Sequence, residues 1–130
     1  MSKVHKIARI GIMPLNLYKE RTISIAKGMY QPKSNEPKIW FTSMKSLASV
    51  LSEENQQLLK LIIEQKPQSV SELEELTGHK RKANNILRTL RKMEQYGLVQ
   101  LVEDSKPHRG RSPLIPKALF DGFSIQLSIA

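Results

Sequence analysis

The segment from residue 79 to residue 92 carries the residue types with which proteins bind nucleic acid. Six of its residues are Lys or Arg and none is acidic. Arg donates two parallel hydrogen bonds to guanine and Asn makes a similar pair with adenine, whereas Lys and Thr suit phosphate oxygens. The segment therefore predicts a DNA-contacting surface made of Lys80, Arg81, Lys82, Asn84, Asn85, Arg88, Thr89, Arg91 and Lys92.

These residues divide into two roles if the segment is a helix with its apolar side turned inward. Base contacts are expected from the outward face, which carries Arg81, Lys82, Asn84, Asn85, Arg88 and Arg91. Phosphate contacts are expected from Lys80, Thr89 and Lys92. A helix face that contacts only solvent is the alternative, because most charge runs in proteins are of that kind.

A second basic group lies in the polar loop between residues 103 and 112. Two arginines flank Gly110 there, and a glycine lets the backbone come close to DNA while both guanidinium groups reach into a narrow minor groove. The loop residues that we expect at DNA are Lys106, His108, Arg109 and Arg111. A solvated loop is the alternative.

The residue inventory disfavours other chemistries. The chain has no cysteine, and its three histidines, at positions 5, 79 and 108, lack metal-ligand spacing. Its six glycines are scattered and form no phosphate-binding loop, and the acidic residues from 72 to 75 fit the solvated face of a short helix. We therefore expect no metal, no cofactor and no enzymatic activity.

The elements that position the basic residues follow from apolar spacing. A helix is expected over 52–65, with Ser52 as its N-cap and Pro67 beyond its end. A short helix is expected from Ser71, as N-cap, to Gly78. A longer helix follows over 81–96, and its inward positions are Ala83, Ile86, Leu87, Leu90 and Met93. A strand over 98–102 and a return strand from Leu114 complete the series.

This order of elements resembles the winged helix-turn-helix of MarR-type prokaryotic regulators. The resemblance lies in the stretch from Val70 to Gly78 and in the step Tyr96-Gly97-Leu98-Val99, and it covers about residues 52–117. In that family the Gly-Leu-Val step ends the recognition helix and begins the wing hairpin. The resemblance implies an α+β protein that binds double-stranded DNA and regulates transcription as a repressor.

The flanking segments are similar to a narrower group of small winged-helix proteins. The similarity lies in residues 21–28, 36–41 and 44–52. That group includes the TumA-like antitoxins, which are partners of TumE-type toxins. The resemblance implies an antitoxin that binds its toxin and autoregulates its operon. The alternative is a MarR-like regulator with no toxin partner, and the neighbouring gene would distinguish the two.

The two ends of the chain are expected to make a homodimer or bind another partner. The sequence suggests an arm and linker over 1–40, a DNA-binding domain over 41–117 and a C-terminal strand over 118–130. A helix over 14–27 would carry Leu15, Tyr18, Thr22, Ile25 and Met29 on one side, and Ser43 would cap a helix through Leu51. The run from Val4 to Ile12 is expected to pair with the C-terminal strand, within or between subunits. The residues proposed for this surface are Ile7, Ile10, Ile12, Trp40, Phe41, Phe123, Ile125 and Leu127.

The charge of the chain fits a polyanionic partner. The net charge is +9, and it divides into +7 over residues 1–50, −4 over 51–75 and +6 over 76–130. No apolar run approaches the ~18 residues of a membrane span. The basic start is followed by no apolar stretch of the kind that a signal peptide needs. We therefore expect a cytoplasmic protein that does not bind membranes.

Overall fold

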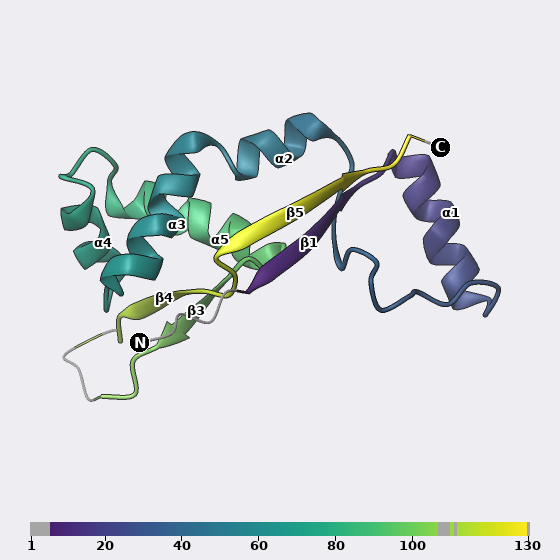
Figure 1. Ribbon diagram of the computed structural model, residues 1–130. Helices are drawn as coiled ribbons and strands as arrows, with labels where there is room; N and C mark the ends of the chain where they lie inside the picture. The colour runs from purple at the N-terminus through teal and green to yellow at the C-terminus, as the bar shows by residue number, and fades with distance from the viewer. Residues whose placement is uncertain (1–5, 107–109, 111, 130) are drawn as a thin grey trace. The chain divides into compact units, whose positions relative to one another are not determined.

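The protein has an α+β fold, seen in a computed structural model that describes residues 6–106, 110 and 112–129 (Figure 1). The chain divides into two compact units. Unit 1 joins the residues up to Ser49 with those from Gly122 onward, and unit 2 runs from Val50 to Asp121. The two ends of the chain thus belong to one unit, because their strands are paired with each other.

Unit 1 contains a three-stranded sheet whose strands are all parallel. Its order is β2 (Ile39–Phe41), β1 (Ile7–Ile12) and β5 (Gly122–Leu127). Ile10 of β1 lies opposite Ile39 on one side and Ile125 on the other. The expected partnership between the two ends of the chain is therefore confirmed, and it forms within a single chain.

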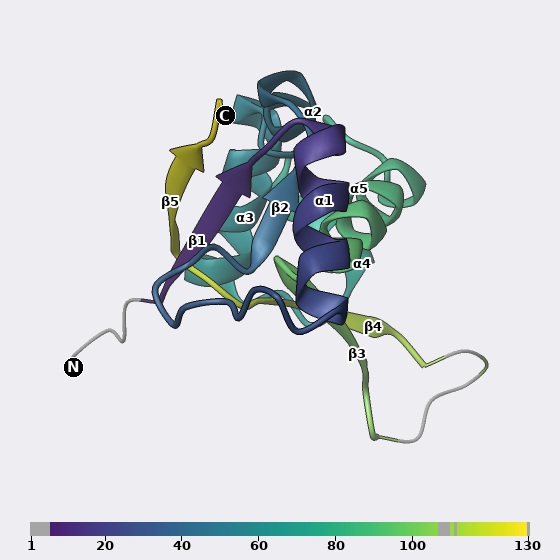
Figure 2. The same cartoon turned by 90° about the vertical axis from the view of Figure 1, so that its right-hand side faces the viewer.

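Helix α1 (Leu15–Ala26) lies beside β2, as Figure 2 shows, and its inward face agrees with the expected one only at Tyr18 and Ile25, which are partly buried. Leu15, Thr22 and Met29 of the expected stripe are exposed, and the partly buried side chains include Leu17 and Arg21. Tyr18 contacts the ring of Trp40 in β2 with a ring-centroid distance of 6.2 Å.

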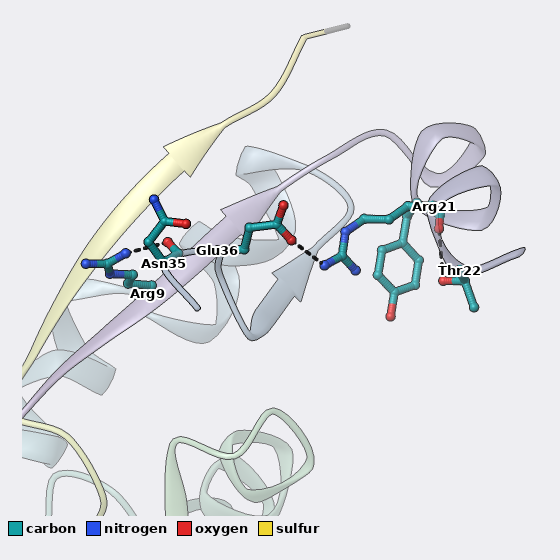
Figure 3. A network of polar contacts seen from close by, with 6 residues as sticks. Arg9, Arg21, Thr22, Asn35 and Glu36 are labelled. Atoms are coloured by element: carbon teal, nitrogen blue, oxygen red, sulfur yellow. Dashed lines mark hydrogen bonds and ion pairs between the residues drawn. The ribbon is translucent and has the colours of Figure 1, made fainter. Parts of the chain in front are cut away.

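Trp40 is the centre of a small cluster that joins α1 to the sheet. Its ring lies so close to Gly11 that a Cβ atom built on Gly11 would approach the ring to 2.2 Å. The Arg21 guanidinium lies 4.9 Å from the ring centroid, a cation–π geometry. Arg21 also donates a 3.0 Å hydrogen bond to Glu36, whereas Arg9 donates to the Asn35 carbonyl oxygen (Figure 3).

The second helix of the chain, α2 (Met44–Val50), begins where the sequence predicts. The Ser43 hydroxyl oxygen accepts a 3.0 Å hydrogen bond from the Ser46 amide, which is the expected N-cap.

Unit 2 contains three helices, α3 (Glu53–Gln65), α4 (Val70–Leu76) and α5 (Ala83–Gln95). The prediction that Ser52 caps α3 is confirmed, because its side chain accepts from the Asn55 amide at 3.3 Å. The prediction that Ser71 caps the next helix is wrong. Ser69 has the extended backbone of an N-cap and accepts from the Glu72 amide, so Ser71 lies inside the first turn.

The antiparallel strands β3 (Val99–Glu103) and β4 (Leu114–Ala118) complete unit 2. Helix α5 packs on α4 and β3, and α3 packs on α4 and β4. The core between these elements is fully apolar, and its most buried members are Leu58, Leu73, Ile86, Leu90, Met93, Leu98 and Val99.

Candidate nucleic-acid interface

Helix α5 has one buried face and one polar, exposed face. Ile86, Leu90 and Met93 have no exposed surface, and Ala83 and Leu87 beside them are partly buried, as helical spacing predicts. The exposed side chains of the helix and its N-cap include Lys82, Asn84, Asn85, Arg88, Arg91 and Lys92. Thr89 and Arg81 are partly buried instead. The structure therefore brings most of the predicted base-contacting residues to one surface, which we call the α5 face.

Three cationic side chains of the α5 face have no acidic partner that would neutralise their charge. Among the residues that the structure describes, none forms a hydrogen bond or an ion pair with the side chains of Arg88, Arg91 or Lys92. The closest acid in sequence, Glu94, accepts a 3.0 Å hydrogen bond from the Leu101 amide of β3. An exposed face with unneutralised guanidinium groups attracts polyanions.

Arg81 plays a different part from the one that its sequence position suggests. Its guanidinium donates to the Asn55 side chain of α3 at 2.8 Å, to the Asn85 side-chain oxygen at 2.9 and 3.1 Å, and to the Thr89 hydroxyl at 2.7 Å. These bonds tie the beginning of α5 to α3. Arg81 is thus a positioning residue, and it orients the amide of Asn85 on the α5 face.

The turn between α4 and α5 is held by Glu74. Gly78 and His79 both have left-handed backbone, with φ of 68° and 60°. One Glu74 carboxylate oxygen accepts from the Ala83 amide at 2.7 Å, and the other contacts the His79 ring nitrogen. The contact with His79, followed by the Ala83 amide, lowers the pKa of Glu74 from its ordinary value of 4.5.

Sequence reasoning placed Glu74 on a solvated helix face and so missed its role. Glu74 and Ala83 are nine positions apart and lie in different helices. No local spacing rule links them. One signal in the sequence points to such a partner. Ala83 begins a helix, and the side chain of its N-cap residue, Lys82, cannot accept a hydrogen bond from the first amides of that helix.

The β3–β4 hairpin carries the second predicted DNA-contacting group. Beyond the paired strands, the Asp104 amide donates to the Pro113 carbonyl oxygen at 3.1 Å and extends the hairpin. Lys106 is exposed, and its amide donates to the Asp104 side chain at 3.0 Å. His108, Arg109 and Arg111 lie outside the described residues.

The residues predicted to form a dimer or partner surface come together in unit 1, but they divide by burial. Ile10, Ile12 and Phe41 are buried within the single chain and are absent from its surface. Trp40 and Phe123 are partly buried, and Ile7 is exposed on β1. The exposed members on the C-terminal strand are Ile125 and Leu127.

Two features of the described part of the chain concern metal binding and membrane insertion. Among residues 6–106, 110 and 112–129, no group of three or more His, Asp or Glu side chains is placed to hold a metal ion. Within the same ranges, no helix has both the length and the apolar character to cross a membrane.

The chain belongs to the HVO_A0114 family. The model of this family matches residues 50–116, which is 67 of the 130 residues. The match lies within unit 2, includes α3, α4, α5 and β3, and ends at residue 116 inside β4. No curated protein and no solved structure matches the chain.

Proposed function

We propose that the protein is a sequence-specific regulator of transcription, a repressor, that binds double-stranded DNA through unit 2 as a winged helix-turn-helix. The observation that carries the proposal is the α5 face. It combines exposed, unneutralised Arg88 and Arg91 with the amides of Asn84 and Asn85, directly opposite a fully buried apolar face.

The proposed mechanism places α5 in the major groove. A helix fits this groove, which is about 12 Å wide, when its polar face is turned to the base edges. Arg88 then contacts guanine and Asn84 contacts adenine, each discriminating by roughly 1–3 kcal/mol against the wrong base. Arg91, one turn further along the helix, is the second arginine that contacts a base, and Lys92 beside it contacts a phosphate.

Two further observations support the same docking. Helix α4 precedes α5 through a turn of six residues, 77–82, that Glu74 and Arg81 hold in place. The β3–β4 hairpin follows α5 directly, in the position of a wing, and carries exposed Lys106 beyond β3. A basic hairpin beside the recognition helix can contact the adjacent minor groove.

The first step of the test is to select a preferred binding site from random DNA duplexes with the native protein. The second step is to measure the affinities of Arg88 variants for this cognate duplex and for a scrambled duplex. Arg88→Lys keeps the charge but loses the two parallel hydrogen bonds. It should therefore lose cognate affinity, by about tenfold or more at one base pair, while binding to scrambled DNA stays unchanged. Arg88→Ala should lose both.

Lys60→Ala is the matched control for this experiment. Lys60 is an exposed cation of the same unit, on α3, one turn from Glu64 and outside the α5 face. Its removal should leave cognate affinity within about twofold, since long-range charge effects are largely screened at physiological salt. Equal losses for Lys60→Ala and Arg88→Ala would contradict the proposed α5 face, as would the selection of no preferred site.

A further inference from the structure

The strand β5 forms an open edge of the unit 1 sheet. It is the outermost strand in the order β2-β1-β5. The Ser128 amide donates to the Ile12 carbonyl oxygen at 2.8 Å, so the backbone amide and carbonyl of Ser128 point toward β1. Because peptide groups alternate in direction along a strand, Gln126 also faces β1, and the amides and carbonyls of Ile125 and Leu127 point outward. No other described strand pairs with β5 on this outer side.

This edge lacks the features with which proteins prevent edge-to-edge pairing. Natural edges are commonly blocked by Lys, Pro or a bulge. The segment from Gly122 to Ile129 has no charged residue and no proline, although the chain as a whole has a net charge of +9. Its register with β1 runs without interruption from Ile7–Gly122 to Ile12–Leu127. The edge is therefore a neutral surface in a chain that otherwise repels its own copies.

The side chains of β5 extend an apolar sheet face that stays partly open. Paired residues of neighbouring strands point to the same face, so Ile125 and Leu127 share the face of buried Ile10 and Ile12. Ile125 and Leu127 are nevertheless 51% and 53% exposed, and Ile129 beyond them is 82% exposed. The opposite face of β5 carries only Ser124, Gln126 and Ser128 over this stretch.

We propose that β5 pairs with β5 of a second copy of this chain, antiparallel, about a two-fold axis beside Gln126. Two-fold symmetry makes a strand edge antiparallel to itself. With the axis beside Gln126, Ile125 lies opposite Leu127 of the second copy, and the four outward amides and carbonyls of these residues pair with their counterparts. Apolar side chains meet apolar ones on one face, and polar side chains meet polar ones on the other.

A second copy fits this edge better than an unrelated strand because the sequence pattern is symmetric about Gln126. Reading outward in either direction gives an apolar residue, a serine and an apolar residue, with Phe123 at one end and Ile129 at the other. A one-residue shift would place apolar residues opposite polar ones on both faces. The pairing also joins two sheets at their long edges and leaves β2, with three residues, as the outer strand of each.

The first test is the oligomeric state of the full chain, measured by sedimentation without DNA. The native protein should be a dimer at micromolar concentration, and the Ile125→Lys/Leu127→Lys variant should be a monomer with an unchanged circular dichroism spectrum. The control is Ile23→Lys, because Ile23 lies in the same unit and is 53% exposed on α1. A native monomer, or a double variant that stays dimeric, overturns the proposal.

The second test reads the register by cross-linking, which the absence of native cysteine makes unambiguous. Directly opposite Cα atoms of a non-hydrogen-bonded antiparallel pair are about 4.5 Å apart, within the range of a disulfide. The Gln126→Cys variant should therefore form a covalent dimer under mild oxidation. In the Ser124→Cys variant the two thiols would be separated by about four residues of strand, roughly 13 Å, and should not cross-link.

Cross-linking of both variants, or of neither, overturns the proposed register. The two tests use no DNA, so their outcome does not depend on the proposed function. A dimer that binds no DNA would contradict only the function, and a DNA-binding monomer would contradict only the β5 pairing.

Discussion

Arg81 and Asn55 lie 26 positions apart in the sequence and are joined by a 2.8 Å hydrogen bond between a guanidinium and a side-chain oxygen. The same guanidinium donates hydrogen bonds to Asn85 and Thr89 in the first two turns of α5. One side chain thus connects α3 with the helix that we propose to read DNA. The stability of unit 2 and the orientation of the α5 face should therefore depend on this contact.

Replacing Arg81 should destabilise the protein, whereas replacing Arg88 should not. Arg81→Ala removes hydrogen bonds from a charged, partly buried donor, a loss of about 1.5–3 kcal/mol in the free energy of unfolding. Arg88 is exposed and has no described partner, so Arg88→Ala should leave this free energy within about 0.5 kcal/mol. Urea titrations of both variants measure the difference. A double-mutant cycle with Asn55→Ala should show coupling between the two residues. Additive losses of stability would contradict a stabilising contact between Arg81 and Asn55.

The contribution of Glu74 to stability should depend on pH. Its pKa in the folded protein lies below the ordinary value of 4.5, chiefly because of the contact with His79. A carboxyl group with a lowered pKa stabilises the folded state above its unfolded pKa, and this stabilisation is lost as the pH falls through the folded pKa. At pH 7 the melting temperature of the native protein should therefore be higher than that of the Glu74→Gln variant. The two melting temperatures should converge below about pH 4. A difference that is constant from pH 7 to pH 3 would contradict this prediction.

Gly11→Ala should destabilise unit 1. The added methyl group would meet the Trp40 ring, which the contacts with Tyr18 and Arg21 hold in place. Overpacking of this kind costs about 1–3 kcal/mol. Thermal unfolding measures the loss, and the Trp40→Leu variant supplies the control. The loss from Gly11→Ala should be smaller in the Trp40→Leu background, and an equal loss in both backgrounds would exclude the ring as its cause.

Binding to DNA should weaken steeply with salt. If a complex neutralises about eight phosphates, the logarithm of the affinity falls against the logarithm of the salt concentration with a slope near −7. A fourfold rise in salt then costs about 10⁴-fold in affinity. Fluorescence anisotropy on one duplex across a salt series gives the slope. A slope shallower than about −2 would mean that the positive charge of the chain does not serve DNA binding.

Periodic apolar residues are sufficient to predict α3 and α5, because each helix buries one stripe in the core of its own unit. The predicted range 81–96 differs from Ala83–Gln95 at its start, since Arg81 and Lys82 lie in the preceding turn. The N-cap of α4 is predicted wrongly because Ser69 and Ser71, two residues apart, both have a side chain that can cap a helix. Only the backbone decides between them, and Ser69 has the extended conformation of a cap.

The contacts that position the candidate site are the part that the sequence does not reveal. Glu74 reaches Ala83 and Arg81 reaches Asn55 across turns whose geometry is set by the packing of three helices. For the same reason the inward face of α1 is predicted correctly only at Tyr18 and Ile25. Helical spacing specifies which residues share a face, but Trp40, 22 positions after Tyr18, decides which face turns inward.

The pairing of β1 with β5 makes unit 2 an insertion within unit 1, and this has a consequence for the order of folding. Unit 2 is continuous from Val50 to Asp121, so all its contacts form between residues of one uninterrupted segment. The unit 1 sheet must instead bring Ile7 to Gly122 across the whole insertion, and closing so long a loop is slow and entropically costly. Prior folding of unit 2 shortens that loop. We therefore expect unit 2 to fold first and the unit 1 sheet to close last.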